Sequence, residues 1–176
     1  MLLRKEANFD LAVRFRAGKA TLGEVFAFIS GLYFRGKLAY GERFGTPLVI
    51  VPGRGLLSPS TILTPREFYE IGDIDVASDN PHFRQPLLND AARTLETGGS
   101  DAKYILLGSI ATKKYTDPLL SVFGERLLFP IEFVGRGDMS RGGLLLRRVA
   151  AAEELSYVAV LGTKLQGQRP GKLPPV

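Results

Sequence analysis

The sequence contains no cysteine and only one histidine, His82. Without cysteine the chain can form no disulfide, no thiolate zinc site and no cysteine nucleophile, and a reducing compartment is the natural expectation. A single imidazole excludes a histidine-rich metal site and limits any Ser-His-Asp arrangement to His82. Because His82 lies between Pro81 and Phe83, we interpret it as a loop or capping residue.

Long uncharged stretches are also missing. The longest run without a charged residue covers residues 55–65 and contains two prolines, whereas a membrane span needs about 18–20 apolar residues. The first ten residues, MLLRKEANFD, carry charges where a signal peptide has its apolar segment. We therefore expect a cytoplasmic protein that does not enter a membrane.

The composition is that of a globular chain. Of the 176 residues, 45% are hydrophobic and 23% are charged, which predicts a single domain, placed here at residues 1–162. Residues 163–176 contain several prolines and glycines and three cations without an acid, so we expect a flexible basic tail. The formal net charge of +5 falls to +2 without this tail. A strong basic stripe, typical of nucleic-acid binders, is therefore not evident in the domain itself.

Several segments have the pattern of strands. Apolar and polar residues alternate over 8–16, which predicts a half-buried strand. The apolar runs 48–51, 103–108 and 126–130 predict short buried strands of the kind found in parallel sheets.

Helices are predicted between these strands. Thr21 and Glu24 have the spacing of a capping box and open a predicted helix over 22–44. Gly31, Gly36 and Gly41 inside it indicate either a break or a close contact with another element. Further helices are predicted over 65–71, 84–97 and 117–123. The first of these opens with a cap at Thr64, a proline at the first helical position and an acid, Glu67, at the third.

The alternation of strands and helices predicts the fold class. We expect a single α/β domain with a mainly parallel sheet and helices on both faces. Residues 144–150 and 156–161 fit either a C-terminal hairpin or a helix followed by a strand, and periodicity alone does not distinguish the two.

Three loops rich in glycine and cations follow predicted strands, at residues 52–60, 108–115 and 135–143. In an open α/β sheet, ligands bind beyond the carboxyl ends of the strands. Glycine allows the backbone to approach a ligand, and arginine and lysine neutralise phosphate. The predicted ligand-binding residues are Gly53, Arg54, Gly55, Ser109, Lys113, Lys114, Arg136, Gly137, Ser140 and Arg141. The loop at 108–115 lacks the spacing of a P-loop.

Asp138 is the candidate catalytic residue. It lies between Arg136 and Arg141, where it is positioned to orient an arginine, act as a base or bind magnesium, which needs only one or two carboxylates besides ligand phosphates. The alternative is a tight turn in which Asp138 pairs with one of these arginines. The cofactor is otherwise unknown, and no metal site is predicted.

Aromatic and cationic residues also follow one another within the predicted helix over 22–44. They are Tyr33, Arg35, Lys37 and Tyr40. Such a set stacks on and neutralises a nucleotide in some proteins. Core packing of the tyrosines with solvated cations is the other interpretation.

Short motifs also carry a family resemblance, and they lie at residues 32–35 with Tyr40, 48–51, 55–59, 108, 114–115, 119–120 and 128–130. Together they resemble the pattern LY-x-S-x-x-F, ILSA-x-x-GLL-x-P, G-x-x-Y-x-x-x-L of a family of small bacterial α/β domains, largely of unknown function. Some relatives of that family accompany 7-deazaguanine modification of nucleic acids. The similarity covers about residues 9–145 and implies an α/β fold and a nucleic-acid context.

The chain departs from this family at one turn, where the usual C-x-x-K is replaced by residues 16–19 (RAGK), which keep the lysine and lose the thiol. Residues 105–108 with Lys113 and Lys114 are also similar to the end of the uracil-DNA glycosylase fold. The Asp-Pro-Tyr motif and the DNA-penetrating histidine of that fold have no counterpart at the matching positions.

Three functions fit these observations. The first is a phosphate-contacting domain that binds a nucleotide or nucleic acid. The second is an enzyme of N-glycosidic or phosphate-ester cleavage that uses Asp138, and the third is a noncatalytic protein-interaction module. The sequence leaves the ligand, the oligomeric state and the choice between catalysis and binding open.

Overall fold

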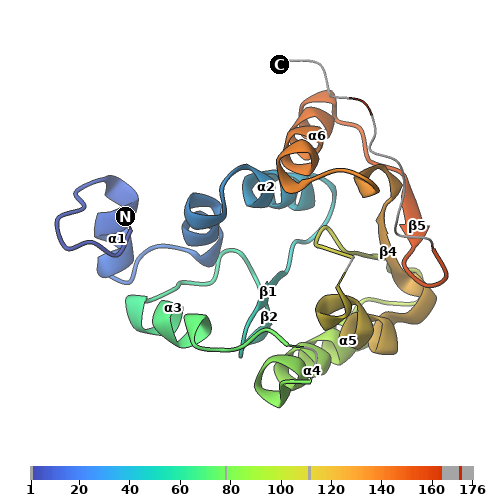
Figure 1. Cartoon of the computed structure of the whole chain (residues 1–176), viewed down its shortest axis with the longest axis horizontal. Coiled ribbons are helices and arrows are strands. Elements are labelled where there is room, and N and C mark those ends of the chain that lie inside the picture. The colour runs from blue at the N-terminus through green and yellow to red at the C-terminus, as the bar shows by residue number, and fades with distance from the viewer. Residues whose placement is uncertain (1, 78, 111, 164–170, 172–176) are drawn as a thin grey trace.

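The chain folds into helices joined by short strands, as shown by a computed structural model (Figure 1). The structure describes residues 2–77, 79–110, 112–163 and 171. Most of the predicted flexible tail therefore lies outside the described residues. The elements are α1 (Asp10–Arg16), α2 (Leu22–Phe44), β1 (Val49–Val51), β2 (Gly55–Leu57), α3 (Pro65–Gly72), α4 (Pro81–Thr97), β3 (Tyr104–Ile105), α5 (Lys113–Phe123), β4 (Leu127–Pro130), α6 (Asp138–Ala151) and β5 (Tyr157–Ala159).

The strands form two small sheets. β1 and β2 make an antiparallel hairpin, and β4 pairs with β3 in parallel and with β5 in antiparallel orientation. The α/β class is confirmed, but the prediction of a mainly parallel sheet is wrong. Only three residues connect Val51 to Gly55, whereas a parallel neighbour needs a crossover of about a dozen residues. Gly53, with φ of 74°, makes the tight turn that reverses the chain.

The predicted strand over 8–16 is instead the helix α1. Ala12 and Phe15, three residues apart on one helical face, are fully buried, while Phe9 and Val13 are largely exposed. Arg14 forms an ion pair with Asp10 at 2.7 Å, one helical turn earlier. The alternation in the sequence was therefore coincidental, because burial follows the helical period.

The long helix α2 is confirmed, and so is the capping box at its start. Thr21 accepts a hydrogen bond from the Glu24 N–H, and the Glu24 carboxylate accepts one from the Thr21 N–H. Gly31 breaks the helix with φ of 65° and ψ of −146°. A Cβ atom on Gly41 would lie 2.9 Å from Pro47 Cβ. The glycines thus provide both a break and a close contact.

The remaining helices occur where they were predicted, with shifted ends. The capping box that opens α3 is present, whereas α4 and α5 begin earlier than expected and β3 is only two residues long. The possible C-terminal hairpin is wrong, because residues 144–151 continue α6 and only β5 is a strand. Since α6 begins at Asp138, the second part of the predicted 135–143 loop is helical.

Three apolar clusters form the core. One joins α1 to the first part of α2 and to α3, a second lies between α4, α5 and β4, and the third joins the second part of α2 to α6. Figure 1 shows α4 beside α5 and α6 close to α2. Among the described residues, no helix combines the length and apolar character needed to cross a bilayer.

The crossing of α2 and α6 depends on two glycines. A Cβ atom on Gly36 would lie 2.7 Å from the Gly142 carbonyl oxygen, and one on Gly142 would lie 2.9 Å from the Leu32 carbonyl oxygen. These separations are too short for any side chain, so the two backbones touch at this point. The contact places residues 33–37 of α2 beside the first turn of α6.

Adding one methyl group at this crossing tests its importance. We expect Gly36→Ala to lower the free energy of unfolding by about 1–3 kcal/mol, because overpacking forces the backbones apart. Gly143→Ala is the matched control on α6, where the added Cβ meets only the end of the Arg147 side chain at 3.4 Å. That variant should gain about 0.5–1 kcal/mol from the helix preference of alanine. Equal urea midpoints for the two variants would contradict the close crossing.

The ionised Glu24 carboxylate stabilises the fold against acid. Hydrogen bonds from the Arg14 guanidinium and then the Thr21 N–H lower the pKa of Glu24 from 4.5 to about 2. Because the folded state holds the ionised form more tightly, this stabilisation is complete above about pH 4.5 and is lost as the pH falls towards about 2. Glu24→Gln should flatten the decline of unfolding free energy over this range. The control is Glu6→Gln at an exposed position, which should retain the wild-type profile in denaturant titrations.

Candidate functional site: the α2–α6 junction

Charged and aromatic side chains from α2 and α6 meet where the helices cross. This set, the α2–α6 junction, consists of Tyr33, Lys37, Asp138 and Arg141. Both Asp138 and Arg141 influence the ionisation of Tyr33, and Asp138 also influences that of Lys37. The predicted residues Asp138 and Arg141 are therefore brought together with two α2 residues whose role the sequence left open.

Lys37 is the least compensated cation of the junction. Its Nζ atom lies 4.5 Å from the centre of the Tyr33 ring and 5.4 Å from that of the Phe34 ring. Among the described residues it has no carboxylate within ion-pair distance. Burial lowers the pKa of Lys37, and the Asp138 carboxylate partly opposes this shift. Lys37 is thus a partly desolvated amine whose strongest contacts are aromatic.

Tyr33 joins the junction to the loop after β3. Its hydroxyl donates a hydrogen bond of 2.8 Å to the Leu107 carbonyl oxygen, and its ring packs edge-on against Phe133 at 6.3 Å between centroids. Burial raises the pKa of Tyr33, while the nearby Arg141 charge opposes the rise. The start of the 108–115 loop is therefore held against the same helix as Arg141.

Arg141 is held in place by backbone. Its Nε and Nη2 atoms donate to the Phe133 carbonyl oxygen at 3.3 and 3.2 Å, and only 14% of its side chain is exposed. Its guanidinium carbon also lies 5.4 Å from the centre of the Phe133 ring. Because the Phe133 carbonyl takes only part of the donor set, the fork retains N–H groups for a further acceptor.

The other predicted residues of this loop surround the start of α6. Arg136 donates to the Glu132 carbonyl oxygen at 3.0 Å and to Ser140 Oγ at 3.2 Å. Gly137 is the N-cap residue, and no side chain within the described part of the chain caps this helix. The first N–H groups of a helix carry partial positive charge, which adds to that of the arginines.

Asp138 is exposed, with 74% of its side chain accessible, and its carboxylate lies 3.9 Å from Arg141 Nη1. This long, solvated ion pair agrees with the alternative in which Asp138 pairs with an arginine of its own loop. Within the described residues no three acidic or histidine side chains gather in a way that would hold a metal ion.

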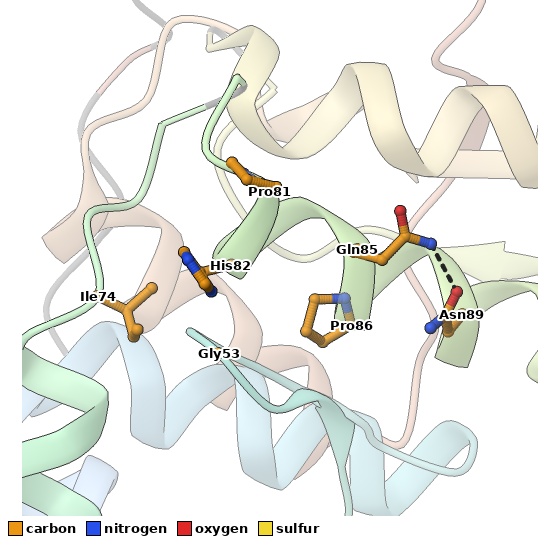
Figure 2. Close-up of a pocket in the computed structure, with 7 residues that line it drawn as sticks. All are labelled: Gly53, Ile74, Pro81, His82, Gln85, Pro86 and Asn89. Carbon is orange, nitrogen blue, oxygen red and sulfur yellow. Dashed lines mark hydrogen bonds between the residues drawn. The ribbon is translucent and has the colours of Figure 1, made fainter.

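The predicted residues of the β1–β2 hairpin contact other elements. Arg54 forms an ion pair with Glu67 of α3 at 2.8 Å and reaches Glu70 at 4.0 Å. A Cβ atom on Gly55 would lie 2.2 Å from the Asp90 carboxylate, so this glycine serves the packing of β2 on α4. Gly53 lines an open pocket beside α4 (Figure 2).

The predicted residues of the 108–115 loop lie around the start of α5. Ser109 is half-buried, Lys113 is exposed in the first turn, and Lys114 Nζ lies 5.2 Å from the centre of the Tyr115 ring. Among the described residues no hydrogen bond or ion pair joins Arg54, Lys113 or Lys114 to the junction. Of the three predicted loops, 135–143 is the one whose described residues contribute charged side chains to the junction.

The set of predicted site residues omitted Tyr33 and Lys37. Both lie in the helix whose aromatic and cationic residues had two interpretations. Tyr40, from the same helix, is a core residue whose hydroxyl accepts from the Leu155 N–H at 2.7 Å. The glycine at position 36 was the available signal, since it marked a close contact next to Lys37.

Comparisons with family models, curated proteins and solved structures found no match. The function is therefore inferred from the geometry of the junction.

The electrostatic arrangement of the junction predicts how Lys37 titrates. We expect its pKa, measured by NMR of the lysine side chain, to lie below the ordinary value of 10.5. Asp138→Asn should lower it further, because the variant loses the negative charge that favours the ammonium form. Asp117→Asn removes an exposed carboxylate of α5 and should leave the Lys37 titration unchanged. A rise in the Lys37 pKa in the Asp138 variant would refute the assigned contact.

Proposed function

We propose that this protein is a phosphate-binding α/β domain whose ligand is a nucleotide or a nucleic acid, bound at the α2–α6 junction. The observation that carries the proposal is the Lys37 ammonium, which is partly desolvated and has no carboxylate in ion-pair contact among the described residues. A buried charge without a partner lowers stability. An anionic ligand supplies the missing partner.

The neighbouring groups supply the rest of an anion site. Arg141 presents a preoriented guanidinium, and Arg136 is held near the first turn of α6 by Ser140. The uncapped start of α6 adds backbone N–H donors. Several cationic donors of fixed orientation bind phosphate more strongly than flexible surface lysines do, since less side-chain entropy is lost.

Three arginines elsewhere in the protein support this location by contrast. Arg14, Arg54 and Arg148 each pair with a glutamate at 2.8 Å or less. Their charges are compensated within the fold, so they attract an external phosphate weakly. We accordingly leave Arg54 out of the proposed site, and we assign Lys113 and Lys114 to secondary contacts along a longer ligand.

Aromatic rings beside these cations favour a nucleotide over inorganic phosphate. Tyr33 and Phe34 lie under the Lys37 ammonium, where a base stacking nearby gains from the same surface. The resemblance to small bacterial domains linked to 7-deazaguanine modification, inferred from the short motifs, belongs to this proposal and points to nucleic acid in particular.

Salt dependence of binding tests the proposal. Labelled single-stranded DNA and RNA oligonucleotides and a nucleoside triphosphate are titrated by fluorescence anisotropy at several salt concentrations. Affinity should fall steeply with salt, and Arg136→Gln should reduce the log-log slope by about one unit, as expected for one lost phosphate contact. Lys37→Gln should weaken binding to every probe.

Two variants serve as controls. Arg66→Gln removes an arginine that is 89% exposed on α3 and should leave the slope unchanged. Asp138→Asn should tighten binding about two- to fivefold, because it removes a negative charge next to the phosphate. Affinity that does not change with salt, or equal losses for Arg66→Gln and Arg136→Gln, would overturn the proposal. Binding of the triphosphate alone would assign the site to mononucleotides.

A further inference from the structure

A second binding feature lies away from the α2–α6 junction, between the tip of the β1–β2 hairpin and the start of α4 (Figure 2). It is an open pocket of about 300 Å³, at the lower end of the range for small-molecule sites. Its lining residues are Gly53, Ile74, Pro81, His82, Gln85, Pro86 and Asn89. None of them belongs to α2 or α6.

The pocket face of α4 has an unusual composition. His82, Gln85 and Asn89 follow one another at helical spacing and lie on one side of the helix, while Phe83 and Leu87 on the other side are buried in the core. An exposed helix face normally carries charged side chains. Here the seven lining residues include no aspartate, glutamate, lysine or arginine, so the pocket suits a neutral ligand.

The two amides are fixed by each other. Gln85 Nε2 donates a hydrogen bond of 2.8 Å to Asn89 Oδ1, as Figure 2 shows. The other polar atom of each amide, Gln85 Oε1 or Asn89 Nδ2, forms no hydrogen bond within the described part of the chain. The pair therefore leaves an acceptor, Gln85 Oε1, at one end and a donor, Asn89 Nδ2, at the other (Figure 2). A nucleobase edge carries both donors and acceptors, so either free end of the pair has a complementary group on such an edge.

Rings and one aliphatic side chain complete the lining of the pocket. Figure 2 shows the rings of Pro81, His82 and Pro86 and the side chain of Ile74 around the opening. Gly53 brings bare backbone to the rim, where a Cβ atom would lie 3.1 Å from Ile74 Cγ1. Pro86 has no N–H group, so the i to i−4 hydrogen bond from position 86 to the His82 carbonyl is missing in this helix.

We infer that this pocket binds a neutral planar heterocycle with an amide-like edge, a nucleobase or its nucleoside. The Gln85–Asn89 pair contacts the base edge and His82 stacks on its face. The inference does not depend on the phosphate site, because the pocket lies on other elements and recognises no charge.

Nucleosides without phosphate test this directly. Adenosine, guanosine, cytidine and uridine are titrated into the full chain, and binding is followed by NMR chemical-shift changes of the His82 ring and the Gln85 and Asn89 side-chain amides. We expect at least one nucleoside to shift all three groups. Asn89→Asp should weaken its binding about tenfold, because a donor is replaced by a charged acceptor. His82→Ala should also weaken it.

The controls separate this site from the proposed phosphate site. Asn8→Asp changes an exposed amide outside the pocket and should leave nucleoside affinity unchanged. Lys37→Gln should likewise leave it unchanged, and inorganic phosphate should not compete. Thermal unfolding of each variant checks that the fold is retained. The absence of shifts with all four nucleosides, or equal affinity in wild type and Asn89→Asp, would refute the inference.

Discussion

The contact between the backbones of Gly36 and Gly142 determines the geometry of the proposed phosphate site. At this separation neither helix has room for a side chain, so α2 and α6 approach more closely than larger residues permit. The same crossing buries Tyr40, Leu144 and Leu145 in the third apolar cluster. Core packing and the position of the cations are thus consequences of one contact, and a change that separates the helices affects both.

Lys37 differs from the ion-paired arginines of the fold in its surroundings. Arg14 on α1, Arg54 in the hairpin and Arg148 near the end of α6 each form an ion pair with a glutamate. At the junction, Arg141 binds a backbone carbonyl and has only a long ion pair of 3.9 Å with Asp138, and Lys37 lies over aromatic rings. A fold optimised for stability alone gains little from an unpaired, partly buried ammonium. In the function proposed above, an anionic ligand supplies the missing partner.

The junction and the α4 pocket differ in the forces they offer. The junction provides charge and aromatic surface, whereas the pocket provides neutral amides, an imidazole and proline rings. Electrostatic attraction acts over about 8–10 Å in physiological salt and discriminates poorly among ligands, while amide hydrogen bonds are short and directional. In our two proposals, the junction therefore contributes mainly affinity and the pocket mainly specificity.

Local signals in the sequence were sufficient to predict several elements. The capping boxes at Thr21 and Thr64 depend on contacts within four residues, and both helices begin where these residues predict. The apolar run over 126–130 likewise predicted a strand, and the structure has β4 there. The prediction of a strand over 8–16 was wrong because apolar residues of this segment fit both the alternating pattern of a strand and the helical period. Tertiary partners decide which face is buried, and one of them is Phe68, whose ring centre lies 5.8 Å from that of Phe15.

The candidate site also combines features that the sequence predicts with features that only the tertiary structure reveals. The sequence alone determined that Asp138, Arg136 and Arg141 lie together, since they occupy one short segment, and that cysteine and histidine-rich chemistry is excluded. Only the tertiary structure decided that Lys37 and Tyr33 join them and that Arg54 pairs with Glu67 instead. The physical reason is that a helix crossing or an ion pair between remote segments depends on how the whole core packs, which no short pattern encodes.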